Sequence, residues 1–377
     1  WRNLMKHLLV TNDFPPKIGG IQSLLWEWWR RLPPESFAVL TSPYEGAGEW
    51  DAQQPFHIER IKEKVLLPRP KMVRQINEMA ARVGADLVVL DPAVPLGIVG
   101  PYLDFPYDVV LHGAEVTVPG RLPLSRPVLA RVLRNARHVI AAGGYPAHEA
   151  ERAARRKLPM TIVPPGVDTT RFVPLGAAQR EHARDRFGIG ANVDMVLGLS
   201  RLVPRKGFDV LIRAVASLSA SNPDVTLVIA GKGRDRKRLE KLANDLSAPV
   251  KFLGRVPDED LPALFGCTDV MSMMCRNRWM GLEQEGFGIV FLEAAACGVP
   301  QVAGDSGGAA EAVEDGVTGK VIQRPKDHAV TALAIEELLR NDALRMGMGV
   351  AARERVERDF TYDKLARTLG DALGVEW

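Results

Sequence analysis

Short, continuous apolar runs recur along the chain, and a helix-like pattern follows most of them. Strands of a parallel sheet are covered by helices on both faces, so each strand is apolar throughout instead of alternating between apolar and polar residues. In the first half, the runs lie in KHLLVTN, FAVLTS, DLVVLD, DVVLHG, HVIAAG and MTIVPPG. In the second half, they lie in DMVLGLS, VTLVIAG, VKFLGRV, DVMSMM, PQVAGD and GKVIQ. Two such series predict an α/β protein with two doubly wound, Rossmann-like domains.

The boundary between the domains is predicted in VPPGVDTTRFVP, residues 163–174, where prolines and a glycine interrupt the alternation. A chain of 377 residues is long enough for two cores of ordinary size. We assign residues 1–167 to the first domain and 168–357 to the second, and we expect a terminal helix at about 358–377 to complete the first domain. In the second domain, an apolar stripe over 207–220 predicts a helix packed on the sheet.

Composition places the chain among folded globular proteins, with 46% hydrophobic and 25% charged residues. Its three cysteines have no CxxC spacing, which argues against a structural zinc site and favours a reducing, cytoplasmic compartment. No apolar run approaches the roughly 18–20 residues needed to cross a bilayer. We therefore expect a cytoplasmic protein that either stays in solution or associates peripherally with the inner face of the plasma membrane.

The net charge is only +3, but basic residues cluster in the first half of the chain. The clusters lie at 60–74, between Arg121 and Arg137, and at 152–157. Solvated helix faces are one interpretation, and a patch for anionic lipid headgroups or an acidic acceptor is the other. Nucleic acid is not an expected partner, because nothing resembles a recognition helix or an aromatic stacking sheet.

A tryptophan-rich segment follows the first predicted strand. Helical spacing places Leu24, Leu25 and Trp28 on a core face and leaves Trp26 and Trp29 nearer its edge. Packing in the core is the default interpretation, and an anchor at a membrane interface is the alternative.

Two features of the first half lie where parallel strands end, which is where open α/β sheets bind ligands. Gly19 and Gly20 form a strand-to-helix turn, so backbone N–H groups can approach an anionic ligand closely. His112 directly follows the strand VVL. A structural turn and a structural histidine are the alternatives to a binding site.

A loop with two cations follows the first strand of the second half. In SRLVPRKGFDV, Arg201 and Lys206 lie five residues apart, and Gly207 closes the turn. Two cations at a strand end suit a diphosphate, because charge-assisted hydrogen bonds are worth about 1.5–3 kcal/mol each. The alternative is a solvated basic loop.

The segment EGFGIVFLEAAACGVP, residues 285–300, combines a glycine turn with two acids. Gly286 and Gly288 permit a tight turn whose amides, at the start of a helix, can bind phosphate. Glu285 can accept hydrogen bonds from sugar hydroxyls, and Glu293 can reach a ribose diol from inside the helix. The acidic segment PDEDLP opens a short helix, where acids complement the helix dipole, so we expect no metal site.

Taken together, GGIQ, HG-x-E, SRLVPRKG, EGFGIVFLEA and ACGVP resemble the motifs of the retaining family-4 glycosyltransferases. The resemblance implies the GT-B fold, in which two Rossmann-like domains face a central cleft. Within the family, TNDFPPKIGGIQS and SRLVPRKG look most like the actinobacterial mannosyltransferases that use GDP-mannose to extend phosphatidylinositol mannoside. The implied activity is therefore an α-hexosyl transfer, with a nucleotide sugar as donor and a lipid-linked acceptor.

The resemblance also assigns roles, residue by residue. His112 would lie over the transferred sugar, Arg201 and Lys206 would neutralise the leaving diphosphate, and Glu285 would bind the sugar. These four residues form the implied catalytic set. The implied donor-binding residues are Gly19, Gly20, Arg201, Lys206, Arg255, Val256, Glu285, Gly286, Phe287, Gly288, Ile289, Val290 and Glu293. Retention is expected by front-face attack, with no metal ion and no cofactor.

The chain departs from the family pattern at several positions. Ala114 replaces a histidine of HGHE, Ala310 replaces the proline of GGAPE, and Trp279 and Met280 stand in an Arg/Gly-rich segment. These changes leave the acceptor open. Two alternative functions also stay open: a family-4 enzyme with another nucleotide sugar or a soluble acceptor, and a sugar-nucleotide-binding protein without catalysis.

Overall fold

The computed structural model of the protein describes residues 5–377. The chain forms two compact units: unit 1 runs to Pro165 and includes Tyr362–Trp377, and unit 2 comprises Gly166–Thr361. The first boundary lies after residue 165, where we had predicted 167. The return to unit 1 begins at Tyr362 instead of near 358, because helix α14 (Asp342–Asp359) still packs in unit 2.

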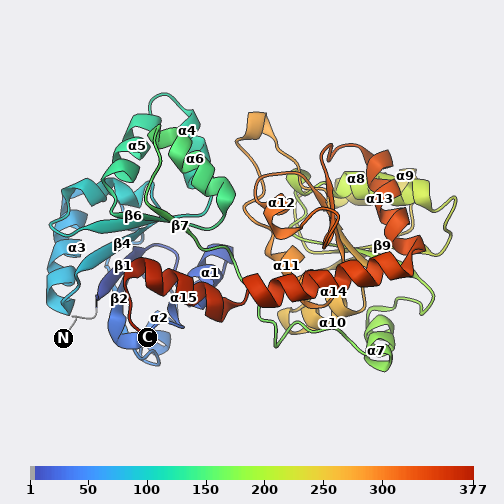
Figure 1. Cartoon of the computed structure of the whole chain (residues 1–377), viewed down its shortest axis with the longest axis horizontal. Coiled ribbons are helices and arrows are strands. Elements are labelled where there is room, and N and C mark those ends of the chain that lie inside the picture. The colour runs from blue at the N-terminus through green and yellow to red at the C-terminus, as the bar shows by residue number, and fades with distance from the viewer. Residues whose placement is uncertain (1–4) are drawn as a thin grey trace. The chain divides into compact units, whose positions relative to one another are not determined.

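Unit 1 is built on a parallel sheet with the order β3-β2-β1-β4-β5-β6-β7 (Figure 1). After β1 the chain adds strands on one side, and from β4 onward it adds them on the other. The carboxyl ends of β1 and β4 therefore form a topological switch point, where ligands bind in this kind of sheet. The strands are β1 (His7–Thr11), β2 (Phe37–Thr41), β3 (His57–Arg60), β4 (Leu87–Asp91), β5 (Tyr107–Leu111), β6 (His138–Ala141) and β7 (Met160–Ile162).

Helices cover both faces of this sheet, and two apolar cores lie between helices and strands. The C-terminal helix α15 packs beside α1 within unit 1 (Figure 1). The helices are α1 (Gly20–Trp29), α2 (Ala47–Asp51), α3 (Pro70–Val83), α4 (Ala114–Arg121), α5 (Arg126–Asn135), α6 (Gly144–Ala154) and α15 (Tyr362–Leu373), with 3-10 turns η1 (Pro34–Ser36) and η2 (Leu96–Tyr102).

Two details of unit 1 differ from the sequence analysis. Strand β3 was missed, because its sequence HIER has no apolar run and it lies at the sheet edge. The placement of Trp29 near an exposed edge was wrong: its side chain is fully buried, and its indole N–H donates to His7 Nε2 at 2.9 Å. Helix α15 packs beside α1, and Trp29 belongs to the same apolar core as Leu365 and Leu369 of α15, so α1 is buried on more than the face that packs on the sheet. Trp26 packs against Trp50, with ring centroids 5.1 Å apart.

Unit 2 is a second parallel sheet with the order β10-β9-β8-β11-β12-β13, and all its strands were predicted. Here the switch point lies between the carboxyl ends of β8 and β11. The strands are β8 (Asp194–Leu199), β9 (Val225–Ala230), β10 (Val250–Gly254), β11 (Val270–Met273), β12 (Gln301–Gly304) and β13 (Gly319–Ile322).

The predicted helix over 207–220 is α8, and the whole predicted apolar stripe, from Phe208 to Leu218, is buried. The helices of unit 2 are α7 (Ala177–Phe187), α8 (Phe208–Leu218), α9 (Arg236–Asp245), α10 (Leu261–Gly266), α11 (Ile289–Ala296), α12 (Ala309–Ala312), α13 (His328–Arg340) and α14, with 3-10 turns η3 (Pro204–Lys206), η4 (Asp258–Asp260) and η5 (Trp279–Gly281).

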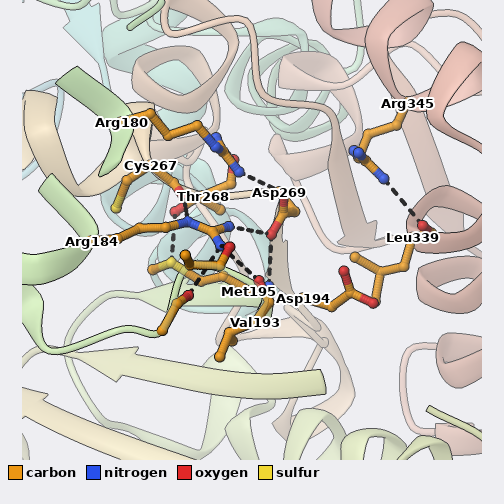
Figure 2. A network of polar contacts seen from close by, with 12 residues as sticks. Arg180, Arg184, Val193, Asp194, Met195, Cys267, Thr268, Asp269, Leu339 and Arg345 are labelled. Carbon is orange, nitrogen blue, oxygen red and sulfur yellow. Dashed lines mark hydrogen bonds and ion pairs between the residues drawn. The ribbon is translucent and has the colours of Figure 1, made fainter. Parts of the chain in front are cut away.

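A polar network holds α7 against the amino ends of β8 and β11 (Figure 2). Asp269 accepts from Arg180 at 2.5 Å, from Arg184 at 2.7 Å and from the Met195 amide at 2.7 Å. Arg184 also donates to the Val193 carbonyl at 2.8 Å. Because this network lies at the strand ends opposite the switch point, we interpret it as structural.

Candidate active site

The predicted residues of unit 1 lie at the carboxyl ends of its central strands. Gly19 precedes α1, and the Gln22 side chain lies against it: a Cβ on Gly19 would be only 2.1 Å from Gln22 Oε1. Space around Gly20 is open. Among residues 5–377, no side chain caps the first turn of α1. These N–H groups are therefore available to an anion, and the anion site that the sequence analysis expects at this turn stays a prediction.

His112 follows β5 and is held by a residue that the sequence analysis missed. Its Nε2 lies 2.6 Å from Oδ1 of Asp91, the last residue of β4. Oδ2 of Asp91 accepts from the Thr11 hydroxyl at 2.6 Å, and Thr11 is the last residue of β1. Asp91 was visible in the sequence as the acid ending the run DLVVLD, at the same strand end as His112.

The charge state of His112 follows from these contacts. Burial by itself would lower the pKa of the imidazole, but the carboxylate of Asp91 in contact with it, and those of Glu115 and Asp13, raise the pKa above its ordinary value of 6.5. Glu115 is also engaged locally, since it accepts from the amides of His112 and Gly113 at 2.5 and 3.0 Å.

In unit 2, Lys206 and Glu285 are in direct contact. The Lys206 ammonium lies 2.6 Å from Glu285 Oε2, and Arg205 Nη1 donates to the same oxygen at 2.6 Å. All three side chains are largely buried. The sequence analysis missed Arg205, because it assigned the cationic role in this part of the loop to the neighbouring Lys206. The second carboxylate oxygen, Oε1, makes no hydrogen bond with any residue from 5 to 377, which leaves it available for a ligand hydroxyl.

Glu285 is ionised despite its burial. Desolvation raises the pKa of this carboxyl, but Lys206 and Arg205 outweigh desolvation and hold the pKa below its usual value of 4.5. The thiol of Cys275 adds a contact at 3.5 Å to Glu285 Oε2. Burial raises the pKa of Cys275 to about 12, so it stays a neutral thiol.

The predicted glycine turn leads into α11, which begins at Ile289. Gly288 caps this helix at φ 85°, in the left-handed region that glycine adopts freely. A second glycine turn packs on the first: a Cβ on Gly308 would lie 2.1 Å from the Gly286 carbonyl oxygen. The backbone amides from Gly286 to Val290 donate no hydrogen bond to a described residue. This arrangement suits an anion, because backbone N–H groups at a helix start carry partial positive charge.

The remaining predicted residues of unit 2 differ in exposure. Arg201 and Arg255 are exposed at the ends of β8 and β10, and Val256 and Val290 pack partly on the core. Phe287 is buried against Phe360, with ring centroids 5.9 Å apart. Ile289 is half-buried.

Glu293 is half-buried in α11. Desolvation, reinforced by Asp258, raises the pKa of this carboxyl to about 7, against a lowering contribution from Arg171. Near neutral pH it can therefore both donate and accept a hydrogen bond, as a diol requires.

The segment that departs from the family pattern forms a small hairpin ahead of Glu285. Arg278 and Glu283 pair through their backbones and through an ion pair at 3.0 Å. Trp279 at its tip is 63% exposed, with the Arg278 guanidinium 4.9 Å from the centre of its ring.

In each unit, therefore, a glycine turn and charged side chains lie near the switch point of the sheet. The fold of the whole chain is also similar to the folds of solved structures. The structure is similar to that of Anabaena HepE in complex with UDP, with a TM-score of 0.82 and 23% identity over 98% of this chain and 99% of that one. It is also similar to WaaG, a glycosyltransferase involved in lipopolysaccharide biosynthesis, with a TM-score of 0.69 and 22% identity over 97% and 99%. The predicted GT-B fold is confirmed.

Sequence comparison gives the family. Residues 179–355 match the family described as "Glycosyl transferases group 1". The chain is 39% identical, over 97% of each sequence, to the GDP-mannose-dependent alpha-(1-6)-phosphatidylinositol monomannoside mannosyltransferase of Mycolicibacterium smegmatis. It is 36% identical, over 98% of each, to the corresponding enzyme for the monoacylated acceptor in Corynebacterium glutamicum. The chain belongs to the group 1 glycosyltransferases, and the predicted resemblance is confirmed.

Proposed function

We propose that this glycosyltransferase moves mannose from GDP-mannose to a lipid-linked acceptor of the phosphatidylinositol mannoside type, with retention of the α configuration. The observation that carries the proposal is the full-length likeness to enzymes named for this donor and this acceptor class. The described contacts supply a chemical rationale for the donor half of the reaction.

In this proposal, unit 2 holds the departing GDP. The free amides from Gly286 to Val290, the exposed Arg201 and the ammonium of Lys206 would surround the diphosphate. An ammonium has three N–H donors, so Lys206 can contact both Glu285 and a phosphate oxygen. Preorganised positive charge aimed at a leaving anion lowers the barrier without a metal ion or a cofactor.

The other predicted residues would bind the rest of the donor. Oε1 of Glu285 would accept from a mannose hydroxyl, and Glu293 would bind the ribose diol. Arg255 and Val256 would lie beside the nucleotide. In unit 1, the backbone N–H groups of the first turn of α1, which begins at Gly20, would bind the diphosphate. His112 would contact the transferred sugar.

Calorimetry tests the donor. GDP is expected to bind more tightly than UDP, and Arg201→Ala is expected to weaken GDP binding by about 10- to 100-fold, the worth of one charge-assisted hydrogen bond. Arg213 is an exposed arginine on α8, so Arg213→Ala should leave GDP binding unchanged. Tight UDP binding with no GDP binding would reject the proposed donor.

A lipid-linked acceptor requires access to a membrane, and we include peripheral binding to anionic lipid in the proposal. No helix within residues 5–377 is both long and apolar enough to cross a bilayer. Of the three basic clusters, two are largely engaged in structural contacts, such as Arg121 with Glu149 and Arg137 with Asp108. The cluster at 60–74 is different, because most of its cations, Lys64 and Arg69 included, are exposed and form no ion pair with a described residue.

This cluster combines charge with exposed apolar side chains. Val65 is 48% exposed, and a hollow of about 320 Å³ beside it is lined by Lys64, Leu67, Arg69 and Lys71 among others. Cations attract anionic headgroups, and apolar side chains beside them can enter the headgroup region.

Vesicle flotation tests this surface. Lys64→Glu combined with Arg69→Glu should reduce binding to anionic phospholipid vesicles at least about tenfold, since each cation contributes about 1 kcal/mol. The matched control is Arg213→Glu with Lys237→Glu, the same charge change at exposed positions of unit 2. Equal recovery with neutral and anionic vesicles would contradict membrane binding through charge.

A further inference from the structure

A chain of short contacts links three neighbouring strand ends in unit 1. The Thr11 hydroxyl donates to Asp91 Oδ2 at 2.6 Å, and Asp91 Oδ1 lies 2.6 Å from His112 Nε2. The residues end or follow β1, β4 and β5, which are adjacent in the sheet. Thr11 and Asp91 are fully buried, and the His112 side chain is 8% exposed. Two bonds thus fix the carboxylate, and the carboxylate fixes one side of the ring.

The other side of the ring lacks a partner. His112 Nδ1 is buried and makes no hydrogen bond with any residue from 5 to 377. Buried polar atoms are nearly always hydrogen-bonded, and this nitrogen lies beside the switch point, at the strand ends where such sheets bind ligands, so it is placed to contact a ligand atom. Glu115 does not serve, because its oxygens accept from the backbone amides of His112 and Gly113 and make no bond with Nδ1.

We propose that Asp91 is a positioning residue that acts through His112: it holds the ring as an imidazolium and directs the Nδ1–H group to a hydroxyl oxygen of the bound sugar. Thr11 fixes Asp91 in turn. The inference deepens the proposed glycosyl transfer and rests on it. Asp91 itself does not touch the substrate.

The surrounding charges favour the imidazolium. The described ion pairs of Asp91 include no lysine or arginine, so the ring is the cation that balances this buried carboxylate. The other charged groups facing the ring are Glu115 on α4 and Asp13 after β1, and Asp13 is paired with Lys17 at 2.9 Å. All three acids stabilise the protonated ring, which keeps a proton on Nδ1 for donation.

Asp91→Asn removes the negative charge of the side chain and keeps its shape. The asparagine carbonyl can still accept from Nε2–H, and its amide can donate to Thr11, so the ring keeps its place. Without the carboxylate, burial dominates, and the ring becomes neutral near pH 7 with Nδ1 as an acceptor. Transfer at pH 7 is expected to fall about 10- to 100-fold, and the alkaline limb of the pH–rate profile is expected to move to lower pH.

The ring is observed directly by NMR of ¹⁵N-histidine-labelled full-length protein, with His112→Gln used for assignment. Wild-type His112 should titrate above pH 6.5 and the Asp91→Asn variant below it. Unchanged titration, or an activity loss equal at every pH, would overturn the inference. Because the titration needs no substrate, it is independent of whether mannose is transferred.

Thr11 supplies a second pair of variants in case Asp91→Asn fails to fold. Thr11→Ser keeps the hydroxyl and should titrate like wild type. Thr11→Val removes the bond to Asp91 and should change the titration midpoint of His112. Identical midpoints in the two Thr11 variants would contradict the role of Thr11.

Discussion

Replacing Lys206 by alanine is expected to lower kcat for mannosyl transfer by about 10²–10³-fold, the usual cost of removing one preorganised donor from a developing anion. The loss should fall mainly on kcat, because the charge on the diphosphate grows as the glycosidic bond breaks. The protein should stay folded, since Arg205 still pairs with Glu285 at 2.6 Å. Turnover and thermal unfolding are measured on the same preparation.

The matched control is Lys237→Ala, which removes an exposed lysine from α9 in the same unit. It should leave kcat unchanged. Near-wild-type turnover of Lys206→Ala would remove Lys206 from the catalytic set.

Replacing Glu285 by glutamine is expected to destabilise unit 2 by about 3–5 kcal/mol, in addition to impairing transfer. The substitution leaves Lys206 and Arg205 buried beside each other without their shared carboxylate, and breaking a buried ion pair on one side costs about this much. For a unit of this size, the midpoint of thermal unfolding should fall by roughly 10 °C. Loss of activity in this variant therefore has two causes, and Lys206→Ala is the cleaner test of catalysis.

The pH dependence of this destabilisation has a definite sign. The pKa of Glu285 is lowered in the folded state, so its contribution to stability is present above the unfolded value of 4.5 and is lost as the pH falls through the folded pKa. The difference in the free energy of unfolding between the wild type and Glu285→Gln should decrease only at acidic pH. Glu240→Gln, which breaks an exposed pair with Arg236, should cost less than about 1 kcal/mol. Equal losses of stability in Glu285→Gln and Glu240→Gln would contradict the interpretation that the buried ion pair of Glu285 stabilises unit 2.

Strands and strand ends could be predicted because their signal is local. Each buried parallel strand is an uninterrupted apolar run, and the residue after it lies at the ligand-binding edge, which pointed to His112 and Arg201. Strand β3 escaped because an edge strand needs no apolar run. Trp29 was misplaced because the apolar core to which it belongs includes residues of α15, more than 330 residues later in the chain.

The contacts inside the site could not be predicted in the same way. Arg205 and Glu285 are 80 residues apart, and so are Thr11 and Asp91, so their pairing depends on which strands are neighbours in the sheet. The sequence marked Lys206 and Glu285 as separate functional residues, but it carried no signal that they share an ion pair. Nor did it show that His112 has a buried carboxylate on one side and an unsatisfied nitrogen on the other.

A crystal soaked with GDP tests the central claim most directly. We predict that the diphosphate oxygens lie about 2.7–3.2 Å from the Lys206 ammonium, the Arg201 guanidinium and the backbone nitrogens between Gly286 and Val290. A bound GDP whose diphosphate lies away from these groups, with their N–H bonds directed elsewhere, would contradict the account.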